Sequence, residues 1–218
     1  MNRAVPGLGM TSQRTRARMI ERLRNEGIRN ERVLSAIAAV PRHAFVEEAL
    51  ASRAYEDSAL PLGFSQTISQ PFIVARMLEL LLEGRELGKT LEIGAGCGYQ
   101  SAVLAQLTHD VYAVERIEPL LAKAKENLRT IQQFRVRLKY ADGHLGLPEA
   151  APFDTIIVAA AASTVPQPLL QQLALGGKML LPLGTGVQNL LMVERRNEGF
   201  VETRLDSVRF VPLLSGLE

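Results

Sequence analysis

One short stretch of the sequence, LEIGAGCGYQ from residue 91 onwards, sets three glycines beside a carboxylate. Gly94, Gly96 and Gly98 have the spacing G-x-G-x-G, whereas the dinucleotide-binding fingerprint has its last glycine one position later. The glycines by themselves also fit a turn that only redirects the chain. Glu92 narrows the choice, because a carboxylate beside a helix N-terminus repels a pyrophosphate and attracts a cation. The stretch therefore predicts a loop for a cationic nucleoside without phosphates.

S-adenosylmethionine is such a ligand, since its adenosine body carries a sulfonium and an α-ammonium group. Glu115 lies 21 residues after Gly94, about where an acidic residue bonds the ribose hydroxyls in nucleotide-binding folds. Asp142 and Gly143 follow the next predicted strand, where the aspartate can accept from the adenine amino group and the glycine can leave room for the ring. Asp-Gly is also a common turn, so this pair gains weight only beside Glu92 and Glu115.

A parallel sheet is needed to bring these residues together, and the sequence alternates accordingly between strand-length apolar runs and helical periodicity. The predicted strands are 90–93, 110–115, 136–140, 153–158 and 178–183. The predicted helices between them are 99–107, 119–129 and 168–173, and Gly176 and Gly177 are expected to end the last of these. A C-terminal hairpin is predicted from strands 190–196 and 201–209, with its turn at 197–199. We therefore expect an α/β fold with a doubly wound, mostly parallel sheet and an antiparallel C-terminal hairpin.

Helices are also predicted before the sheet. Thr11 is the expected cap of a first helix that ends near residue 26, and Asn30 is the expected cap of a second helix that Pro41 ends. We expect a single domain over 1–218, in which residues 1–70 hold these helices and an active-site loop and 71–218 form the cofactor-binding α/β core.

The predicted loop is PLGFSQTISQ, residues 61–70, which carries no charge. Pro71 suits the first position of a third helix. Gln70 rather than Ser69 is then the expected cap, which leaves the Ser69 hydroxyl for another role.

Composition limits the class of function. The 218 residues are 47% hydrophobic and 22% charged, as in ordinary globular proteins. The longest apolar run, 156–162, is far shorter than the roughly 18 residues of a membrane span, and no signal-peptide pattern is present at the N-terminus. Cys97 is the only cysteine, no Cys/His cluster has metal spacing, and the net charge is only +2. We expect a cytoplasmic monomer with no metal, no membrane contact and no nucleic-acid partner.

Over nearly its whole length the sequence also resembles a known family, the protein-L-isoaspartate O-methyltransferases. The segments that carry the resemblance are VPRHAFV (40–46), YEDSALPLG (55–63), QTISQPFIVARM (66–77), LEIGAGCGYQSAVLA (91–105), VYAVERIEPL (111–120), DG (142–143) and VRFVPLL (208–214). Many methyltransferases share the glycine loop, whereas QTISQP and the terminal VRFVPL are specific to this family. Bacterial relatives usually have His-Gly before QTIS, where this chain has Phe64 and Ser65.

The resemblance implies a Rossmann-like fold that uses S-adenosylmethionine. It implies methyl transfer to the free α-carboxylate of L-isoaspartyl residues in damaged proteins and peptides, which starts their repair through a succinimide. Ser69 matches the family's active-site serine. The family's cofactor contacts map onto Gln66, Thr67, Ile68, Ser69, Glu92, Gly94, Gly96, Glu115, Asp142 and Gly143.

Few catalytic groups are needed for this reaction. A carboxylate with a pKa of about 3.3–3.9 is ionised at neutral pH and attacks a methyl group without a general base. The site must align the reacting atoms and exclude water. We expect the Ser69 hydroxyl and nearby backbone N–H groups to orient the carboxylate, with Gln66 and Thr67 closing over the cofactor. Cys97 has no histidine near it in sequence and is expected to be passive.

Two interpretations remain for the terminal stretch Arg209, Phe210, Val211 and Pro212. Its alternation fits an ordinary edge strand about as well as a segment that lines the substrate site. An exposed edge could also bind an extended peptide through main-chain hydrogen bonds.

Three other functions compete with protein repair. The first is an S-adenosylmethionine-dependent methyltransferase for another carboxylate or a small molecule; enzymes that methylate exocyclic amines have an Asn/Asp-Pro-Pro-aromatic segment where this chain has four alanines, 159–162. The second, a nicotinamide oxidoreductase, is disfavoured by Glu92 and the glycine spacing. The third, a non-catalytic binding protein, has no use for the QTISQP segment.

Overall fold

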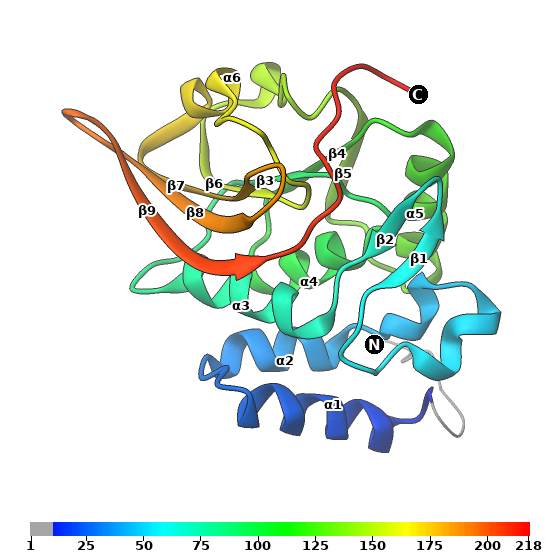
Figure 1. Ribbon diagram of the computed structural model, residues 1–218. Coiled ribbons are helices and arrows are strands. Elements are labelled where there is room, and N and C mark those ends of the chain that lie inside the picture. Colours follow the sequence, from blue (N-terminus) through cyan, green and yellow to red (C-terminus); the bar gives the residue numbers. More distant parts are fainter. Residues whose placement is uncertain (1–10) are drawn as a thin grey trace.

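A seven-stranded sheet crosses the protein, whose computed structural model describes residues 11–218 (Figure 1). Its strands lie in the order β5-β4-β3-β6-β7-β8-β9. Neighbours from β5 to β7 are parallel, and β8 and β9 are antiparallel. The strands are β3 (Thr90–Ile93), β4 (Val111–Glu115), β5 (Val136–Tyr140), β6 (Phe153–Val158), β7 (Leu173–Leu183), β8 (Gln188–Arg196) and β9 (Gly199–Val208). This confirms the predicted sheet and its C-terminal hairpin.

Helices cover both faces of the sheet, and α1 and α2 form a further layer beneath α3 and α4 (Figure 1). The helices are α1 (Gln13–Asn25), α2 (Glu31–Ala39), α3 (Pro71–Leu82), α4 (Tyr99–Leu107), α5 (Glu118–Thr130) and α6 (Gln167–Gln171), with short 3-10 turns η2 (Arg42–Phe45), η3 (Glu48–Arg53) and η4 (Pro148–Ala150). In this part of the chain, residues 11–218, none of the helices is long and apolar enough to cross a membrane.

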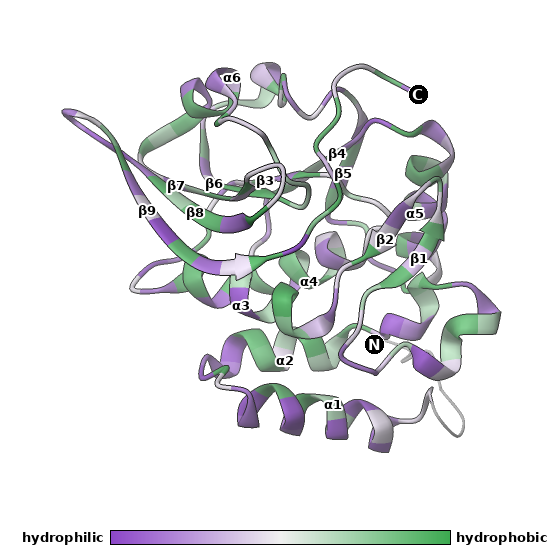
Figure 2. Ribbon diagram, in the orientation of Figure 1, coloured by the Kyte–Doolittle hydropathy of each residue, from purple (hydrophilic) through white to green (hydrophobic). Residues whose placement is uncertain are grey.

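The sheet separates two apolar clusters. Adjacent residues of β6, Ile156 and Ile157, belong to different clusters, because successive strand side chains point to opposite faces. One cluster joins the sheet to α1–α4, and the other joins it to α6. Figure 2 shows this pattern as hydrophobic colouring along the central strands and hydrophilic residues over α1. The helical layer before residue 55 is therefore part of the same core as the sheet.

The first two helices begin with side-chain caps, as expected, but one cap is shifted. The Asn30 carboxamide oxygen accepts from the backbone N–H groups of Arg32 and Val33 at 3.0 and 3.3 Å, which confirms Asn30 as the cap of α2. At α1 the cap is Ser12, whose hydroxyl accepts from the Thr15 N–H at 3.4 Å, and the prediction of Thr11 was wrong by one residue.

Residues 61–70 are not the predicted loop. They contain most of an antiparallel hairpin, β1 (Leu60–Gly63) and β2 (Gln66–Ile68), joined by the two residues Phe64 and Ser65. Both turn residues have positive φ, 51° and 54°, as a type I′ turn requires. The sequence hid the hairpin because type I′ turns usually use Asn-Gly or Asp-Gly, and because both strands are very short.

Two further predictions in the C-terminal half were wrong. Gly176 and Gly177 do not end a helix; they lie inside β7, where the pairing with β6 shifts between Phe153 and Thr155. A Cβ on Gly177 would lie 3.0 Å from the Phe153 carbonyl oxygen, so the irregular pairing needs glycine there.

Residues 209–212 are not an edge strand either. The edge strand β9 ends at Val208, and the chain then leaves the sheet edge and crosses to the carboxyl end of β6. There the Ala161 N–H donates to the Val211 carbonyl at 2.7 Å, and the Leu213 N–H donates to the Ala161 carbonyl at 2.7 Å. The proline at 212 suits a segment that has left the ladder.

The hairpin turn gives a first testable prediction. Ser65→Gly should raise the free energy of unfolding by about 0.5–1 kcal/mol, because glycine adopts a positive φ without the strain that an L side chain carries. Urea denaturation of the two proteins measures the difference.

Gly63→Ala is the matched control on the same hairpin. Gly63 has φ 83° with open space around its missing Cβ, so alanine there should destabilise by about 1 kcal/mol through backbone strain alone. Equal stability of all three proteins would contradict the strained-turn interpretation.

Candidate active site

A cleft of about 840 Å³, including its open mouth, lies at the carboxyl ends of the parallel strands. The strand register explains the position, because Ile93 pairs with Val114 and Val158, so the chain leaves β3, β4 and β6 at one edge. Of the predicted site residues, the cleft is lined by Gln66, Thr67, Ile68, Ser69, Glu92, Gly94, Gly96, Glu115, Gly143, Val211 and Pro212. The structure thus brings most of the predicted set into one cavity, and it leaves Asp142, Arg209 and Phe210 off the wall.

The glycine loop joins β3 to α4 with a tight backbone path. Gly98 caps α4 at φ 86°, and a Cβ there would lie 3.3 Å from the Ala124 side chain of α5. Glycine is therefore required both by the left-handed conformation and by the approach of α5. Two residues before Gly98, the Gly96 N–H donates to a carboxylate oxygen of Glu115 at 2.8 Å, which links the loop to the end of β4.

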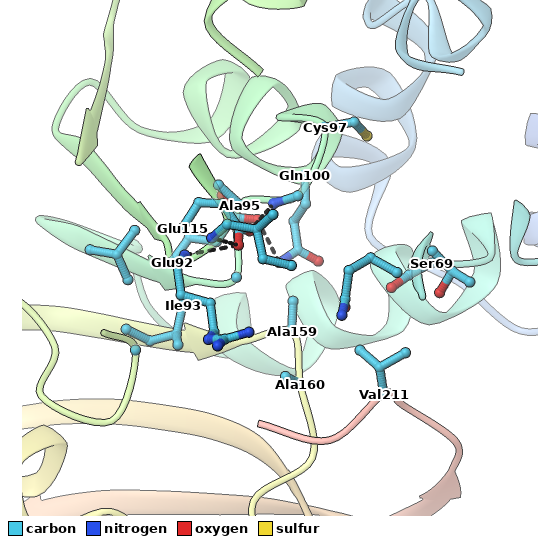
Figure 3. A pocket seen from close by; sticks show the side chains of 18 of the residues that line it. Ser69, Glu92, Ile93, Ala95, Cys97, Gln100, Glu115, Ala159, Ala160 and Val211 are labelled. Carbon is cyan, nitrogen blue, oxygen red and sulfur yellow. Dashed lines mark hydrogen bonds between the residues drawn. The ribbon is translucent and has the colours of Figure 1, made fainter. Parts of the chain in front are cut away.

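Glu92 is fully buried at the centre of β3 and still lines the cleft. One carboxylate oxygen accepts from the Gln100 amide nitrogen at 3.0 Å, and the other accepts from the Ser101 hydroxyl. Both donors come from the first turn of α4. Figure 3 shows Glu92, Glu115 and Gln100 on one side of the pocket and Ser69 on the other.

Burial raises the pKa of Glu92 from its ordinary value to about 8. The hydrogen bonds from Ser101 and Gln100 act in the opposite direction, and the negative charge of Glu115 adds to the rise. No basic side chain of residues 11–218 is among the groups that act on it. Burial therefore favours the protonated form of Glu92 at neutral pH.

Glu115 ends β4 with its carboxylate fixed in place. One oxygen accepts from the Gly96 N–H, and the other accepts from the N–H groups of Arg116 and Ile117 at 2.8 and 3.0 Å. A carboxylate has about four acceptor positions, so acceptor capacity remains for a ligand hydroxyl. The position agrees with the ribose-binding role expected for Glu115, which stays a prediction.

The Asp142 carboxylate accepts hydrogen bonds from the protein's own backbone. Its two carboxylate oxygens accept from the N–H groups of His144 at 2.8 Å and Gly216 at 2.6 Å. Partial burial acts to raise the pKa of Asp142, but these two backbone donors and the nearby His144 ring outweigh it, so the pKa lies below the usual value. Asp142 thus anchors the chain after residue 214, and its predicted contact with adenine stays a prediction.

Gly143 does line the cleft, and the structure gives a reason for glycine that sequence reasoning did not. A Cβ there would lie 2.5 Å from the Ile93 side chain. The Ile93 side chain of β3 therefore leaves no room for a larger residue than glycine at position 143, independently of any ligand.

Ser69 follows the hairpin and is half-buried on the cleft wall. As predicted, Gln70 and not Ser69 is the N-cap residue of α3, and Pro71 is in its first turn. The acceptor at this helix start is Asp57, which accepts from the Phe72 N–H at 2.8 Å and from the Gln70 amide at 3.1 Å. Capping therefore does not account for Ser69.

The N-terminal layer reaches the glycine loop through a buried cation. Arg42 is fully buried, donates to the Ala54 carbonyl at 2.8 Å, and lies over the Tyr99 ring at 4.8 Å from its centroid. Tyr99 is the first residue of α4, and burial raises its pKa to about 12. Arg42 thus ties the chain before the hairpin to the loop beneath it.

Sequence reasoning missed several wall residues. Gln100 lines the cleft and, together with the buried Ser101 behind the wall, donates to Glu92, but nothing in the glycine motif marks either residue as a partner of Glu92. Leu62 also lines the cleft, at the irregular pairing of β1, and its side chain lies near Gly96. Cys97 is buried, and desolvation raises its pKa to about 11, so it remains a thiol, as a passive residue would.

Comparisons with known protein sequences identify the same family. The model of the family Protein-L-isoaspartate(D-aspartate) O-methyltransferase (PCMT) matches residues 14–218. A protein-L-isoaspartate O-methyltransferase of Dechloromonas aromatica is 75% identical over 97% of this chain and 99% of its own length. One from Aromatoleum aromaticum is 61% identical over the whole of both chains.

Solved structures agree on the fold. A protein-L-isoaspartate O-methyltransferase superposes with a TM-score of 0.84 at 26% identity, over 93% of this chain and 67% of the other. A Plasmodium falciparum structure assigned to the same family has a TM-score of 0.80 at 24% identity, over 90% and 97% of the two chains, and contains S-adenosyl-L-homocysteine.

The burial of Glu92 predicts an unusual effect of its removal. Because its pKa rises from 4.5 to about 8 on folding, its contribution is fully favourable below about pH 4.5 and is lost as the pH rises to about 8. Glu92→Gln keeps the shape without the charge, so the empty variant should be more stable than wild type by up to about 3–5 kcal/mol at pH 8.

Thermal unfolding across this pH range checks the prediction, and the stability difference should vanish near pH 4.5. Glu198→Gln, in the exposed turn between β8 and β9, is the control and should change little. A Glu92→Gln protein that is less stable than wild type at pH 8 would mean that the carboxylate is held charged without a ligand.

Proposed function

Since the chain belongs to the protein-L-isoaspartate(D-aspartate) O-methyltransferase family, we propose that it methylates the free α-carboxylate of L-isoaspartyl residues in damaged proteins and peptides. The methyl donor of this family is S-adenosylmethionine. The observation that carries the proposal is the division of one cleft into two walls: Glu92 and Glu115 on one side, and on the other Ser69, which belongs to the uncharged segment 66–69 of the cleft lining (Figure 3). A cationic donor and an anionic acceptor need such a pair of walls.

The acidic wall fits the donor. Glu92 is a buried acid without a cation beside it in the described chain, as expected if the donor's α-ammonium is its partner. Glu115 faces the same cleft with acceptor capacity left for ribose hydroxyls. We assign Gly94, Gly96, Asp142 and Gly143 to the same cofactor site, with Gly143 on the wall and Asp142 as its neighbour in the chain, bonded to Gly216.

The uncharged wall fits the acceptor. The substrate carboxylate is already ionised at neutral pH, so no side chain has to remove a proton. Ser69 donates its hydroxyl to one carboxylate oxygen and leaves the other to attack, while Gln66, Thr67 and Ile68 close the hairpin over the donor. A full positive charge here would bind the carboxylate more strongly before the reaction than during it and would slow the attack.

Methyl transfer in this cleft requires no proton transfer, because the carboxylate that attacks is already ionised. The bound sulfonium supplies an electrophilic methyl group and leaves as a neutral thioether when the carbon–sulfur bond breaks. The carboxylate oxygen forms the new carbon–oxygen bond and becomes an ester. Two opposite charges disappear together, so a cleft that excludes water favours the step. The ester then closes to a succinimide when the following backbone nitrogen expels methanol, and hydrolysis returns part of it to normal aspartate.

The terminal segment completes the acceptor side. Val211 and Pro212 lie on the cleft wall, held by the Ala161 pairing, whereas Arg209 and Phe210 do not line it. Because the segment pairs with residue 161 rather than standing at a sheet edge, we assign Val211 and Pro212 a side-chain role in shaping the mouth. Arg209 and Phe210 position them: the Phe210 N–H donates to Gln188 at 2.6 Å.

We further propose a cytoplasmic monomer without a membrane or nucleic-acid partner. The buried free thiol of Cys97 suits a reducing compartment. The most exposed apolar side chains of residues 11–218, Val187, Phe134 and Leu175, lie in three separate segments of the chain.

Transfer of labelled methyl from S-adenosylmethionine tests the proposed function. A peptide with L-isoaspartate should be methylated and the same peptide with L-aspartate should not. Ser69→Ala should lower kcat/KM for the isoaspartyl peptide by roughly 10- to 100-fold, because one orienting hydrogen bond to the reacting carboxylate is lost.

Ser35→Ala, an exposed serine on α2, is the matched control and should behave as wild type. Equal methylation of both peptides, or of neither, would contradict the assigned substrate. An unchanged rate for Ser69→Ala would remove the role of this hydroxyl while leaving the reaction in place.

A further inference from the structure

Gln100 and Ser101 have no role in the reaction described so far, yet both hold the acid of the cofactor site. They are the second and third residues of α4, which begins directly after the glycine loop. Gln100 donates to one oxygen of Glu92 at 3.0 Å, and Ser101 donates to the other. Gln100 also lines the cleft itself, where Figure 3 shows it between Glu92 and the side occupied by Ser69. Gln100 therefore connects the buried acid with the cavity, and Ser101 holds the acid from the buried side.

The surroundings of Glu92 offer hydrogen bonds but no compensating charge. Its strand neighbours in the register are Ala113 of β4 and Ile157 of β6, both apolar. Glu115 at the end of β4 acts on it with a negative charge, and Cys97 in the glycine loop is a buried, protonated thiol. Arg116, the residue after Glu115, also lines the cleft, but its charge is not among those that act on Glu92. Val74 of α3, the hairpin residues Gln66 and Thr67, and Ser69 after the hairpin are uncharged wall residues.

Two donated hydrogen bonds are thus what favours the charged form of this carboxyl group before a ligand binds. Hydrogen bonds to a carboxylate stabilise its anionic form, whereas burial and a neighbouring acid oppose it. Capping does not explain the pair, because the start of α4 is set by the left-handed Gly98 and its approach to α5. An apolar pair of residues in the first turn of α4 would fill the same space.

We propose that Gln100 and Ser101 are positioning residues for Glu92, which favour the anionic form of its carboxylate that the cofactor's α-ammonium needs and thereby set the pH range of cofactor binding. The inference rests on the proposed function only through the cofactor and not through the identity of the methyl acceptor. Binding to a protein with neutral Glu92 must release one proton to solvent. Affinity then rises about tenfold per pH unit until Glu92 is ionised in the free enzyme.

Removal of one of the two hydrogen-bond donors to Glu92 should shift the pH range of cofactor binding to higher pH. Without the Gln100 amide, ionised Glu92 keeps only the Ser101 hydroxyl, so the free enzyme becomes ionised at a higher pH. The variant should therefore bind more weakly than wild type below this range and as well as wild type above it. A side chain that merely supports the fold would weaken binding by the same factor at every pH.

Calorimetric titration with S-adenosylmethionine from about pH 6.5 to about pH 9.5 tests the proposal on wild type, Gln100→Met and Ser101→Ala. The ratio of the variant Kd to the wild-type Kd cancels the cofactor's own titration. We expect a ratio of roughly ten at the low end that falls to within about twofold at the high end, for one lost hydrogen bond to a charged group. Gln106→Met, exposed on the same helix, is the control and should give a ratio near one throughout.

A constant ratio above one would overturn the proposal in favour of a structural role, and a ratio of one at every pH would overturn it outright. Proton release, measured in two buffers of different ionisation enthalpy, should be larger for Gln100→Met than for wild type near pH 8.5 if the proposal holds. Failure of wild type to bind the cofactor at any pH would overturn both this inference and the proposed function. Normal pH-dependent binding without methyl transfer to the isoaspartyl peptide would overturn only the assigned acceptor.

Discussion

Glu92 lies in the first parallel strand, fully buried, with two hydrogen-bond donors beside it and, in residues 11–218, no basic group acting on it. Burial of a carboxylate without a counter-ion is costly, so it favours the protonated form of this group in the absence of a ligand. The arrangement suits a site whose ligand brings the missing positive charge. The burial of Glu92 thus lowers the stability of the protein without ligand, and such destabilising groups are common at functional sites.

The rest of the fold places a second, uncharged wall opposite this acid. The hairpin β1–β2 carries Gln66 to Ile68 over the glycine loop, and Asp57 takes over the capping of α3 so that Ser69 stays available. Arg42 ties the helical layer to Tyr99 at the start of α4, beneath the same loop. The segment after β9 crosses the carboxyl ends of the strands and closes the cleft from the third side, anchored by Asp142. Elements from both ends of the chain thus meet over one loop.

Much of this arrangement could be predicted because it depends on local patterns. The parallel strands, the glycine loop and the acids at the strand ends follow from periodicity and spacing, so it could be predicted that Glu92 and Glu115 lie at one cleft. The hairpin was missed because Phe64 and Ser65 adopt a turn that their side chains do not signal. The role of Asp142 as an anchor, and of Gln100 as a partner of Glu92, depends on contacts between distant segments that no local pattern encodes.

The central claim is that Glu92 is neutral in the empty enzyme and becomes charged when the cofactor binds. Carbon-13 NMR of labelled glutamate side chains, assigned by comparison with Glu92→Gln, reports the protonation of this carboxyl group directly. The account predicts a titration midpoint near 8 without ligand. With saturating S-adenosylmethionine the midpoint should fall by about two units or more, because an opposite charge then lies beside the group. An ordinary midpoint near 4.5 in the empty enzyme, unchanged by the cofactor, would contradict it.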